Sequence, residues 1–342
     1  MTEQYRAMSL IAPETLELRD KPLKEPGPKE VLVKVSLAGV CGTDLAIYGG
    51  HYQVDLPLVL GHEFCGVVAQ VGADISTSWI GRRVAVDINN SCLAYQKEDP
   101  CPECKKQMPR HCRTRTVTGI IQMDGAFAEY ITVPAQNLHP LPDAISDRAA
   151  VLVEPMAAAL QTFIMRPLVL DEYVVVLGTG RLGLLIVAAA KSHGAKVIGI
   201  SRSQVKRDFA KRFGADEILA PSPDLPQQIQ EITGGMLADV VVEASGNPEI
   251  LKDAIELVRP RGTICLKTTA GVPSQIDLTR IIVDEIQLST SRCGPFAPTI
   301  HFLEQHDLPI EDWIQETFPL SQLPQGMEAA TQPGKFLISP QQ

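Results

Sequence analysis

The segment GTGRLG, Gly178–Gly183, constrains the fold of this chain more than any other stretch. It directly follows the apolar run YVVVL and opens a segment whose apolar residues recur at helical spacing (Leu185, Ile186, Ala189). Gly194 is placed to end that helix, and the apolar run KVIGIS follows it. The order strand, glycine-rich turn, helix, strand predicts a βαβ unit and therefore a parallel sheet.

Glycines at this spacing, in this context, are typical of a turn that binds a dinucleotide. We expect Gly178 to permit the tight turn, Gly180 to let the backbone approach a pyrophosphate, and Gly183 to let helix pack on strand. Arg181 and Leu182 lie at the helix N-terminus, where free N–H groups and the positive end of the helix dipole attract phosphate. The alternative is a glycine turn in the same kind of sheet without a ligand.

The residues at the end of the second strand bear on which dinucleotide is bound. NAD sites place an acidic residue about twenty positions after the glycines, where it binds the ribose 2′-hydroxyl. This chain has Ser201 and Arg202 there, with Lys206 and Arg207 one turn later. A carboxylate would repel a 2′-phosphate, whereas Arg202 can pair with one. Charge matching therefore favours NADP; a solvated Arg202 in a site that takes NAD is the alternative.

The rest of the chain has two kinds of sequence pattern, one before and one after residues 139–147. In the first part, short apolar runs such as EVLVKVSL, residues 30–37, lie between glycine- and proline-rich turns, which predicts a barrel or a sandwich. After residues 139–147, HPLPDAISD, strand-like and helical patterns alternate. PSPDLPQQ, residues 221–228, is expected to be a surface loop, and GKFLISP, residues 334–340, one last strand.

Length and composition exclude several classes of protein. With 342 residues, 45% of them hydrophobic, the chain is long enough for two folded domains. Its net charge of −9 argues against a nucleic-acid partner. No apolar run is long enough for a membrane span or, near the N-terminus, for a signal peptide. We therefore expect a cytoplasmic protein whose eight cysteines bind metal or lie in the core.

Four residues outside the glycine motif are candidate ligands of a catalytic metal. They are Cys41 in AGVCGTD, His62 and Glu63 in LGHEF, and Glu154 in VEPMAAAL. Thiolate, imidazole and carboxylate are the three ligand types that zinc accepts, and a catalytic site uses three protein ligands and leaves one position open. The alternative for each residue alone is ordinary: a buried cysteine, a capping histidine, a surface glutamate.

The segments CGTDLAIYGG, LPLVLGHEF, VEPMAAAL and LGTGRLG, in this order, resemble the zinc-dependent branch of the medium-chain dehydrogenase/reductase superfamily. They are more similar to its polyol and threonine dehydrogenases than to liver-type alcohol dehydrogenases. The resemblance implies an α/β protein with a GroES-like β-barrel catalytic domain over 1–145 and 290–342. A Rossmann domain, a doubly wound parallel sheet over 146–289, is implied beside it, with zinc in the cleft between them.

The same resemblance implies roles for the candidate ligands. Cys41, His62 and Glu63 would hold the catalytic zinc, with Glu154 as fourth ligand or as a neighbour that contacts the metal through water. Zinc would polarise the hydroxyl of a small-molecule alcohol, or the carbonyl in the reverse direction, while hydride passes between substrate and NAD(P). The implied enzyme is a homodimer or homotetramer.

Three further positions bear on this chemistry. Thr43 occupies the place of the family's proton-relay hydroxyl; a turn-capping threonine is the alternative. Many polyol-type relatives carry a histidine where this chain has Ala46, so the exit of the proton is open, and His51 is a candidate substitute. Arg292, in SRCGPF, would contact the cofactor's phosphates or a substrate hydroxyl, or form a salt bridge between domains.

The densest group of cysteines lies in a segment near residues 88–115, and it predicts a second, structural zinc site. Relatives hold this zinc with the spacing C-x2-C-x2-C-x7-C, whereas here the spacing is C-x8-C-x2-C-x7-C. Four thiolates suit a closed tetrahedral zinc site, so the favoured ligands are Cys92, Cys101, Cys104 and Cys112. The alternatives are Glu98 in place of Cys92, a contribution from His111, a redox-active pair of cysteines, or an iron–sulfur cluster.

The favoured function is therefore a zinc- and NADP-dependent dehydrogenase of a secondary alcohol, polyol or similar compound. A non-catalytic nucleotide-binding or redox-sensing protein on the same fold is the main alternative, and a zinc-free quinone reductase is another. Cys65, Cys265 and Cys293 are expected to be unliganded thiols, because a buried thiol is the default for a free cysteine.

Overall fold

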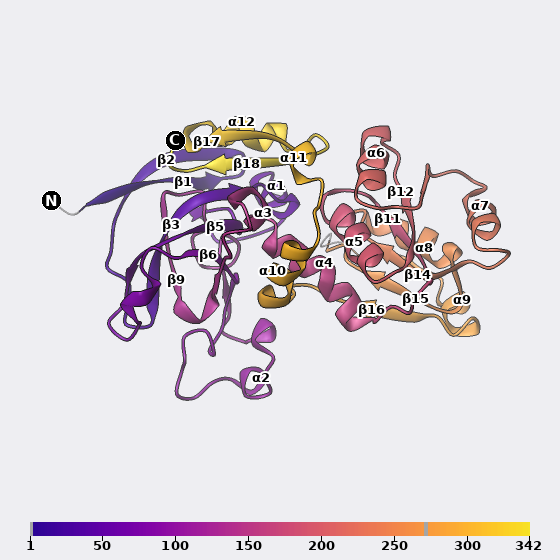
Figure 1. Ribbon diagram of the computed structural model, residues 1–342, viewed down its shortest axis with the longest axis horizontal. Coiled ribbons are helices and arrows are strands. Elements are labelled where there is room, and N and C mark those ends of the chain that lie inside the picture. Colours follow the sequence, from indigo (N-terminus) through magenta and orange to yellow (C-terminus); the bar gives the residue numbers. More distant parts are fainter. Residues whose placement is uncertain (1–2, 270–272) are drawn as a thin grey trace. The chain divides into compact units, whose positions relative to one another are not determined.

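The computed structural model of the chain describes residues 3–269 and 273–342 (Figure 1). It divides into two compact units. The first unit is made of Met1–Glu154 and Phe296–Gln342, and the second is Pro155–Pro295. The chain thus leaves the first unit once and returns to it.

Both crossing points lie further along the chain than the positions expected from sequence, 145/146 and 289/290. Helix α3 (Asp147–Ala150) follows the expected first boundary, yet it packs on strands of the first unit. The expected second boundary would cut strand β16 (Gln287–Thr290), which is the last strand of the sheet in the second unit. Tertiary packing determines these two positions, and the local change in sequence pattern does not reveal it.

The first unit is built around a seven-stranded, mainly antiparallel sheet with the order β10-β6-β5-β3-β18-β17, in which β9 also pairs with β3. Its strands are β3 (Glu30–Gly39), β5 (Glu63–Val71), β6 (Arg83–Val86), β9 (Tyr130–Pro134), β10 (Leu138–Pro140), β17 (Ile314–Pro319) and β18 (Lys335–Ser339). A second sheet has the order β2-β1-β4, with β1 (Gln4–Ala12), β2 (Thr15–Pro22) and β4 (Leu58–Val59). Apolar side chains from both sheets form one core.

Short elements complete the first unit. The pair β7 (Asn89–Asn90) and β8 (Thr116–Val117) brackets the cysteine-rich segment. The helices and helical turns are α1 (Gly42–Tyr48), η1 (Thr77–Trp79), α2 (Pro102–Lys105), η2 (Pro109–His111), η3 (Ala135–Asn137), α3, α10 (Phe296–Gln305), α11 (Ile310–Trp313), η5 (Leu320–Gln322) and α12 (Leu323–Ala329). Helix α4 (Val153–Met165) begins at the end of this unit and continues into the second.

Strand β3 shows how the alternating pattern is used. Val31, Val33 and Val35 are fully buried, and Lys34 between them is exposed, as alternation predicts. Leu37 is only half-buried, because the register with β5 shifts between Val35 and Leu37. Such an irregularity changes which face a side chain occupies, and the sequence pattern does not announce it.

The second unit contains a six-stranded sheet in which every pair is parallel, with the order β13-β12-β11-β14-β15-β16. This is the strand order of a Rossmann fold. The strands are β11 (Tyr173–Leu177), β12 (Lys196–Ile200), β13 (Glu217–Leu219), β14 (Ala238–Glu243), β15 (Val258–Leu266) and β16. The connecting helical elements are α5 (Arg181–Ser192), α6 (Gln204–Arg212), α7 (Leu225–Ile232), η4 (Pro248–Ile250), α8 (Leu251–Leu257) and α9 (Leu278–Val283). The predicted fold class is confirmed.

The loop expected at 221–228 is wrong in its second half, because α7 begins at Leu225. Pro226 lies in the first turn of this helix, where its missing N–H leaves no bond unmade. Leu225 and Ile229 are buried in the core of the second unit. Proline in this segment starts a helix that tertiary packing stabilises, rather than marking a loop.

The helices of the described residues are short. The longest of them, α4, has 13 residues. Within residues 3–269 and 273–342, no helix combines the length and the apolar character that crossing a membrane requires.

Candidate functional site

Cys41, His62 and Glu63 converge in the first unit. In the antiparallel pairing of β3 with β5, Gly39 at the end of β3 lies opposite Glu63 at the start of β5, and Cys41 follows Gly39 by two residues. One possible ligand atom from each of the three side chains lies within 4.8 Å of the other two. His62 and Glu63 are 3% and 2% exposed, and Cys41 is half-buried. Sulfur, nitrogen and oxygen donors this close suit a zinc ion.

Asp44 holds this cluster together, and the sequence analysis did not single it out. Its carboxylate accepts hydrogen bonds from the backbone N–H of Cys41 at 2.8 Å and of Gly61 at 3.2 Å, which fixes the backbone of Cys41 and of the residue before His62. Asp44 is fully buried and lies at the third position of α1, so C-x-x-D at a helix start was the available signal.

The same carboxylate faces the imidazole of His62. One Asp44 oxygen lies 3.2 Å from Nδ1 of His62, although the angle is not that of a hydrogen bond. Burial alone would lower the pKa of His62, but Asp44 and then Cys41 act against burial and raise the pKa well above its ordinary value. A buried imidazole between a carboxylate and a thiol is thus placed where a cation is favoured. The donor set fits a metal ion.

Lys335 is the second residue that sequence reasoning missed. It is 1% exposed, forms a hydrogen-bonded ion pair with Glu63, and donates to the carbonyl of Val40 at 3.1 Å. Gly39 leaves room for the pair, because a Cβ there would lie 2.8 Å from both Glu63 Oε2 and Lys335 Cε. A charged residue in the apolar strand GKFLISP was the only signal, and it lies far from Glu63 in sequence.

Glu154 and Thr43 lie outside the group of three ligand atoms. Glu154 is in the first turn of α4, and burial raises its pKa to about 7; the charge of His62 opposes this shift, while Glu63 and Asp87 add to it. Thr43 is half-buried in α1, and no residue of the described chain forms a hydrogen bond with its hydroxyl. This hydroxyl is therefore free to bind an external group.

Two other predicted positions are exposed. The His51 side chain lies at the surface just after α1, and Arg292 is exposed in the segment before α10. Arg292 has interactions of its own within the described chain and does not line the nucleotide pocket described below. Neither residue joins the Cys41, His62 and Glu63 group.

The cysteine-rich segment forms a second group. Ligand atoms of Cys92, Cys101, Cys104 and Cys112 lie within 4.8 Å of one another, with Sγ–Sγ distances of 3.5 Å between Cys92 and Cys112 and 3.7 Å between Cys101 and Cys112. Cys92 thus completes the group. Glu98 and His111 are exposed and lie outside it.

The electrostatics of this second group also suit a cation. Burial raises the pKa of Cys104 to about 12, and its neighbours Cys101 and Cys112 add to the rise. Burial acts in the same direction on Cys112, but hydrogen bonds that begin with the backbone N–H of Cys92 lower its pKa to about 6. Four sulfurs this close cannot all carry negative charge without a cation among them. Zinc satisfies that requirement with four thiolates.

The remaining cysteines are separate from both groups. Cys65 and Cys265 are buried and Cys293 is half-buried, and none of them forms a disulfide. Burial raises the pKa of Cys265 to about 11 and that of Cys65 well above its usual range. These two buried thiols stay protonated at neutral pH, as an unreactive core cysteine does.

The glycine motif of the second unit adopts the expected turn between β11 and α5. Gly178 has φ +92°, and a Cβ there would lie 2.5 Å from Cα of Ser245. A Cβ on Gly183 would lie 1.9 Å from the carbonyl oxygen of Gly178, so helix and turn pack closely. At Gly180 a Cβ would meet nothing within 4 Å, which leaves the space that an approaching ligand needs.

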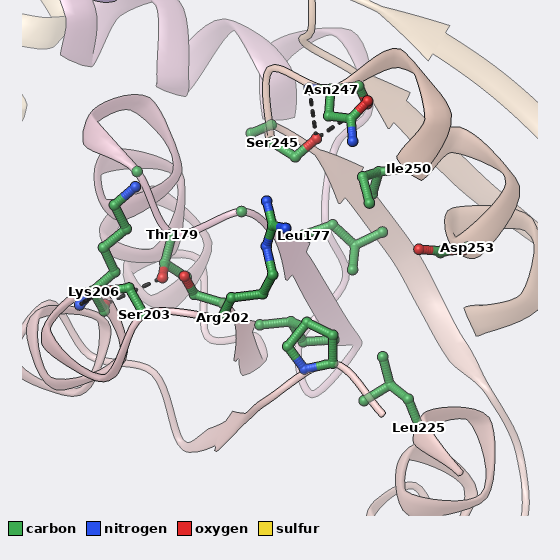
Figure 2. Close-up of a pocket in the computed structure, with 16 residues that line it drawn as sticks. Leu177, Thr179, Arg202, Ser203, Lys206, Leu225, Ser245, Asn247, Ile250 and Asp253 are labelled. Atoms are coloured by element: carbon green, nitrogen blue, oxygen red, sulfur yellow. Dashed lines mark hydrogen bonds between the residues drawn. The ribbon is translucent and has the colours of Figure 1, made fainter. Parts of the chain in front are cut away.

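A cavity of about 430 Å³ lies beside this turn (Figure 2). Of the predicted cofactor-binding residues in the second unit, those that line it are Gly178, Gly180, Ser201, Arg202 and Lys206; Arg181, Leu182, Gly183 and Arg292 do not. Figure 2 shows Arg202 extending from the end of β12 toward Leu177, with Ser245, Asn247 and Asp253 on other sides of the cavity. These last three, which the sequence analysis missed, come from the region after β14.

Matches to known families cover both units. The model of the alcohol dehydrogenase GroES-like domain matches residues 27–143, and that of the zinc-binding dehydrogenases matches residues 182–305. A sorbitol dehydrogenase of Halalkalibacterium halodurans is 32% identical over 312 residues, which are 89% of each chain. An L-threonine 3-dehydrogenase of Pyrococcus furiosus is 33% identical over 83% of this chain and 81% of its own length.

Solved structures agree with these matches. RspB of Escherichia coli CFT073, in complex with NADH, has a TM-score of 0.90 at 30% identity and covers 98% of this chain and 99% of its own. A zinc-binding dehydrogenase of Sinorhizobium meliloti 1021, bound to NADP, has a TM-score of 0.87 at 28% identity and covers 99% and 100%.

The chain therefore belongs to the zinc-dependent medium-chain alcohol dehydrogenases. It is an oxidoreductase that interconverts an alcohol and its carbonyl compound with zinc and a nicotinamide dinucleotide. The predictions of family, fold class and enzyme class are confirmed, and the non-catalytic alternative gains no support.

Proposed function

We propose that this enzyme oxidises a secondary alcohol or polyol, and reduces the matching ketone, at a zinc ion held by Cys41, His62 and Glu63. The observation that carries the proposal is the convergence of three unlike donor atoms within 4.8 Å of one another, in a buried setting that favours a cation. The relatives point to the same substrate class: they include enzymes named for sorbitol, L-threonine and L-galactonate, compounds that all carry secondary hydroxyl groups.

The proposed mechanism divides the work among residues of the first unit. A zinc ion held by Cys41, His62 and Glu63 would supply a Lewis acid for the substrate oxygen, and the nicotinamide cofactor would supply the hydride acceptor or donor. Thr43, whose hydroxyl is free of other partners, takes the proton of the substrate hydroxyl and passes it toward solvent. Glu154 completes the metal site directly or through water, and His51 is a surface acceptor for the outgoing proton.

The nucleotide cavity supports NADP as the preferred cofactor, with NAD as the alternative. Arg202 and Lys206 both line the cavity, and within the described part of the chain neither the Arg202 guanidinium nor the Lys206 ammonium has a hydrogen bond or an ion pair. Ser201 stands where an acidic residue would repel a 2′-phosphate. The unpaired positive charges of Arg202 and Lys206 favour binding of the additional phosphate of NADP.

The cysteine-rich segment has a different proposed role. Cys92, Cys101, Cys104 and Cys112 hold a structural zinc, because four thiolates fill the tetrahedral shell and leave no position for substrate. Thiolates of this kind persist in a reducing compartment, which favours the cytoplasm.

We also propose a homodimer or homotetramer, with the edge of the second unit's sheet as a contact. Strand β16 ends the sheet among the described residues, and an unpaired edge is a ready partner for a second chain. Apolar side chains that flank this edge are exposed: Ile282 is 71%, Val283 72% and Leu288 45% accessible. Exposed apolar groups beside a free edge are typical of a subunit interface.

A panel of secondary alcohols and polyols, each assayed with NADP and with NAD, tests the proposed activity. Turnover is followed through nicotinamide absorbance before and after removal of metal by a chelator, and after zinc is restored. We expect oxidation of at least one secondary alcohol, faster with NADP at limiting cofactor, that is lost on chelation and recovered with zinc. Activity that survives complete removal of zinc would contradict the proposal.

A further inference from the structure

The turn between β12 and α6 carries the residues that face the nucleotide cavity, and its backbone is held from two sides. On the strand side, the N–H of Ser201 donates to the carbonyl of Leu219 at 3.2 Å. On the helix side, the Ser203 hydroxyl caps α6 by accepting from the N–H of Lys206 at 3.4 Å. The carbonyls of Ser201 and Arg202, between these anchors, need partners of their own.

Arg207 supplies those partners. One nitrogen of its guanidinium, Nη1, donates to the carbonyl of Ser201 at 2.6 Å and to the carbonyl of Arg202 at 3.0 Å. The other, Nη2, donates to Oε1 of Gln204 at 2.5 Å. The planar guanidinium thus joins two consecutive peptide groups of the turn to the first residue of the helix. Neither peptide plane can rotate without breaking one of these bonds.

The three cationic side chains of this region therefore fall into two groups, which differ in whether the charged group is already hydrogen-bonded. Arg202 and Lys206 line the cavity, and their charged groups have no partner in the described chain, so they are available to a ligand. Arg207 is half-buried, does not line the cavity, and has its donors engaged by the turn. Sequence alone presents the three as one basic cluster, whereas the structure separates ligand-binding candidates from a support.

We propose that Arg207 is a positioning residue for recognition of the cofactor's 2′-phosphate. By holding the carbonyls of Ser201 and Arg202, it fixes the peptide planes that set the direction of the Arg202 side chain. Figure 2 shows that this side chain extends toward Leu177. It also neutralises two carbonyl oxygens whose partial negative charge would oppose a phosphate nearby. The inference rests on the proposed role of Arg202 in binding NADP. Because the turn is ordered before the cofactor binds, little of the binding free energy from Arg202 is lost in ordering the turn.

Calorimetric titration of the purified full-length protein with two nucleotides tests this role. The probes are 2′,5′-ADP, which carries the 2′-phosphate, and 5′-AMP, which lacks it. The variants are Arg207→Met, which removes every donor but keeps an unbranched stem, Arg202→Ala, and the double variant. Arg207→Lys is the second single variant should Arg207→Met fold poorly, because a compact ammonium does not reproduce the planar fork. Lys211→Ala is the matched control, since Lys211 lies on the same helix and donates to a different carbonyl, that of Asp216.

We expect Arg207→Met to weaken 2′,5′-ADP about tenfold, an effect in the range of coupled neighbouring residues. Binding of 5′-AMP should change less than about twofold, the range of a surface substitution. In the Arg202→Ala background the Arg207→Met effect on 2′,5′-ADP should largely disappear, because the side chain that Arg207 positions is gone. Lys211→Ala should leave both affinities unchanged.

Two results would overturn the inference, and they differ from failure of the proposed cofactor. Equal weakening of both nucleotides by Arg207→Met, or an undiminished effect in the Arg202→Ala background, would show that Arg207 only stabilises the turn. If the native protein binds 2′,5′-ADP no more tightly than 5′-AMP and Arg202→Ala changes neither, the NADP preference itself is wrong, and the role of Arg207 falls with it.

Discussion

The two metal-type clusters of the first unit are built in opposite ways. In the cysteine-rich segment, four identical donors come from a single stretch of chain and pack against one another as a small core of their own. In the other cluster, Cys41, His62 and Glu63 contribute three different donors, and they are brought together by the pairing of two strands. Four thiolates would fill the coordination shell of a zinc ion. Three ligands of different types would leave one coordination position open for a substrate.

The surroundings of the two clusters differ as well. The donors around Cys41 depend on Asp44, which bonds the backbone beside two of them, and on Lys335, which pairs with Glu63 from the far end of the chain. In the cysteine segment, the sulfurs are themselves much of the apolar packing. The proposed structural site is thus specified locally, whereas the proposed catalytic site depends on contacts between distant parts of the chain.

Replacing Cys41 should separate the clusters most clearly. We expect Cys41→Ser to lower turnover about a thousandfold or more, the scale of losing a Lewis acid worth several kcal/mol, while the free energy of unfolding changes little. The measurements are nicotinamide absorbance, zinc content by mass spectrometry and urea unfolding. Turnover at the native rate that still depends on zinc would show that this cluster is not the reactive centre.

Cys104 is fully buried among the other three thiols. Replacing it should lower stability strongly and turnover only weakly, the reverse of the effect at Cys41. We expect Cys104→Ser to lose one zinc per chain and to reduce the free energy of unfolding by several kcal/mol, because a filled structural site contributes folding energy. Turnover per folded molecule should fall far less than in Cys41→Ser. The buried Cys265, outside both clusters, offers the control: Cys265→Ser should keep the full zinc content. Unchanged stability with abolished turnover would reverse the assignment of the two clusters.

The ion pair between Lys335 and Glu63 gives a third test. Lys335→Met leaves the buried Glu63 carboxylate without a cation, so the metal-free protein should lose about 3 to 5 kcal/mol in its free energy of unfolding. In the zinc-loaded protein the loss should be smaller, because the metal also compensates the carboxylate. Lys34→Met, on the exposed side of β3, is the control and should change stability by less than about 0.5 kcal/mol. Equal losses with and without zinc would mean that Glu63 does not contact the metal.

Of the four substitutions, replacement of Asp44 is expected to have the smallest effect. Asp44→Asn keeps the size of the side chain but removes the charge that faces His62 and weakens the bonds to the backbone of Cys41 and Gly61. We expect zinc affinity at the catalytic cluster to fall about 10- to 100-fold, the usual effect of losing a residue that orients a metal ligand. Competition with a chromophoric chelator measures this loss. Asp74→Asn, at an exposed turn, should show none.

Local motifs allowed the family, the fold class and most of the candidate site to be predicted. Glycine spacing indicated the turn after β11, and cysteine spacing indicated a closed metal group, although the insertion before Cys101 left Cys92 and Glu98 as alternatives. Only the folded segment shows Cys92 beside the other three sulfurs. The resemblance named Cys41, His62 and Glu63 together, because the family's motifs carry them in order.

Features that depend on distant contacts could not be read in this way. Lys335 is far from Glu63 in sequence, and no local pattern predicts their pairing. The shift of register that leaves Leu37 half-buried, and the helix that begins at Leu225 in a proline-rich segment, are decided by neighbouring strands and by the core. The division of three basic residues into two that face the cavity and one, Arg207, that supports the turn likewise follows only from the positions of carbonyl groups.

Anomalous diffraction from crystals of the protein purified with zinc, recorded on both sides of the zinc absorption edge, tests the central claim most directly. Two zinc positions are predicted for each chain, one among the sulfurs of Cys92, Cys101, Cys104 and Cys112, and one beside Cys41, His62 and Glu63. A single zinc among the four cysteines, with no anomalous peak beside Cys41 at full zinc loading, would contradict the account.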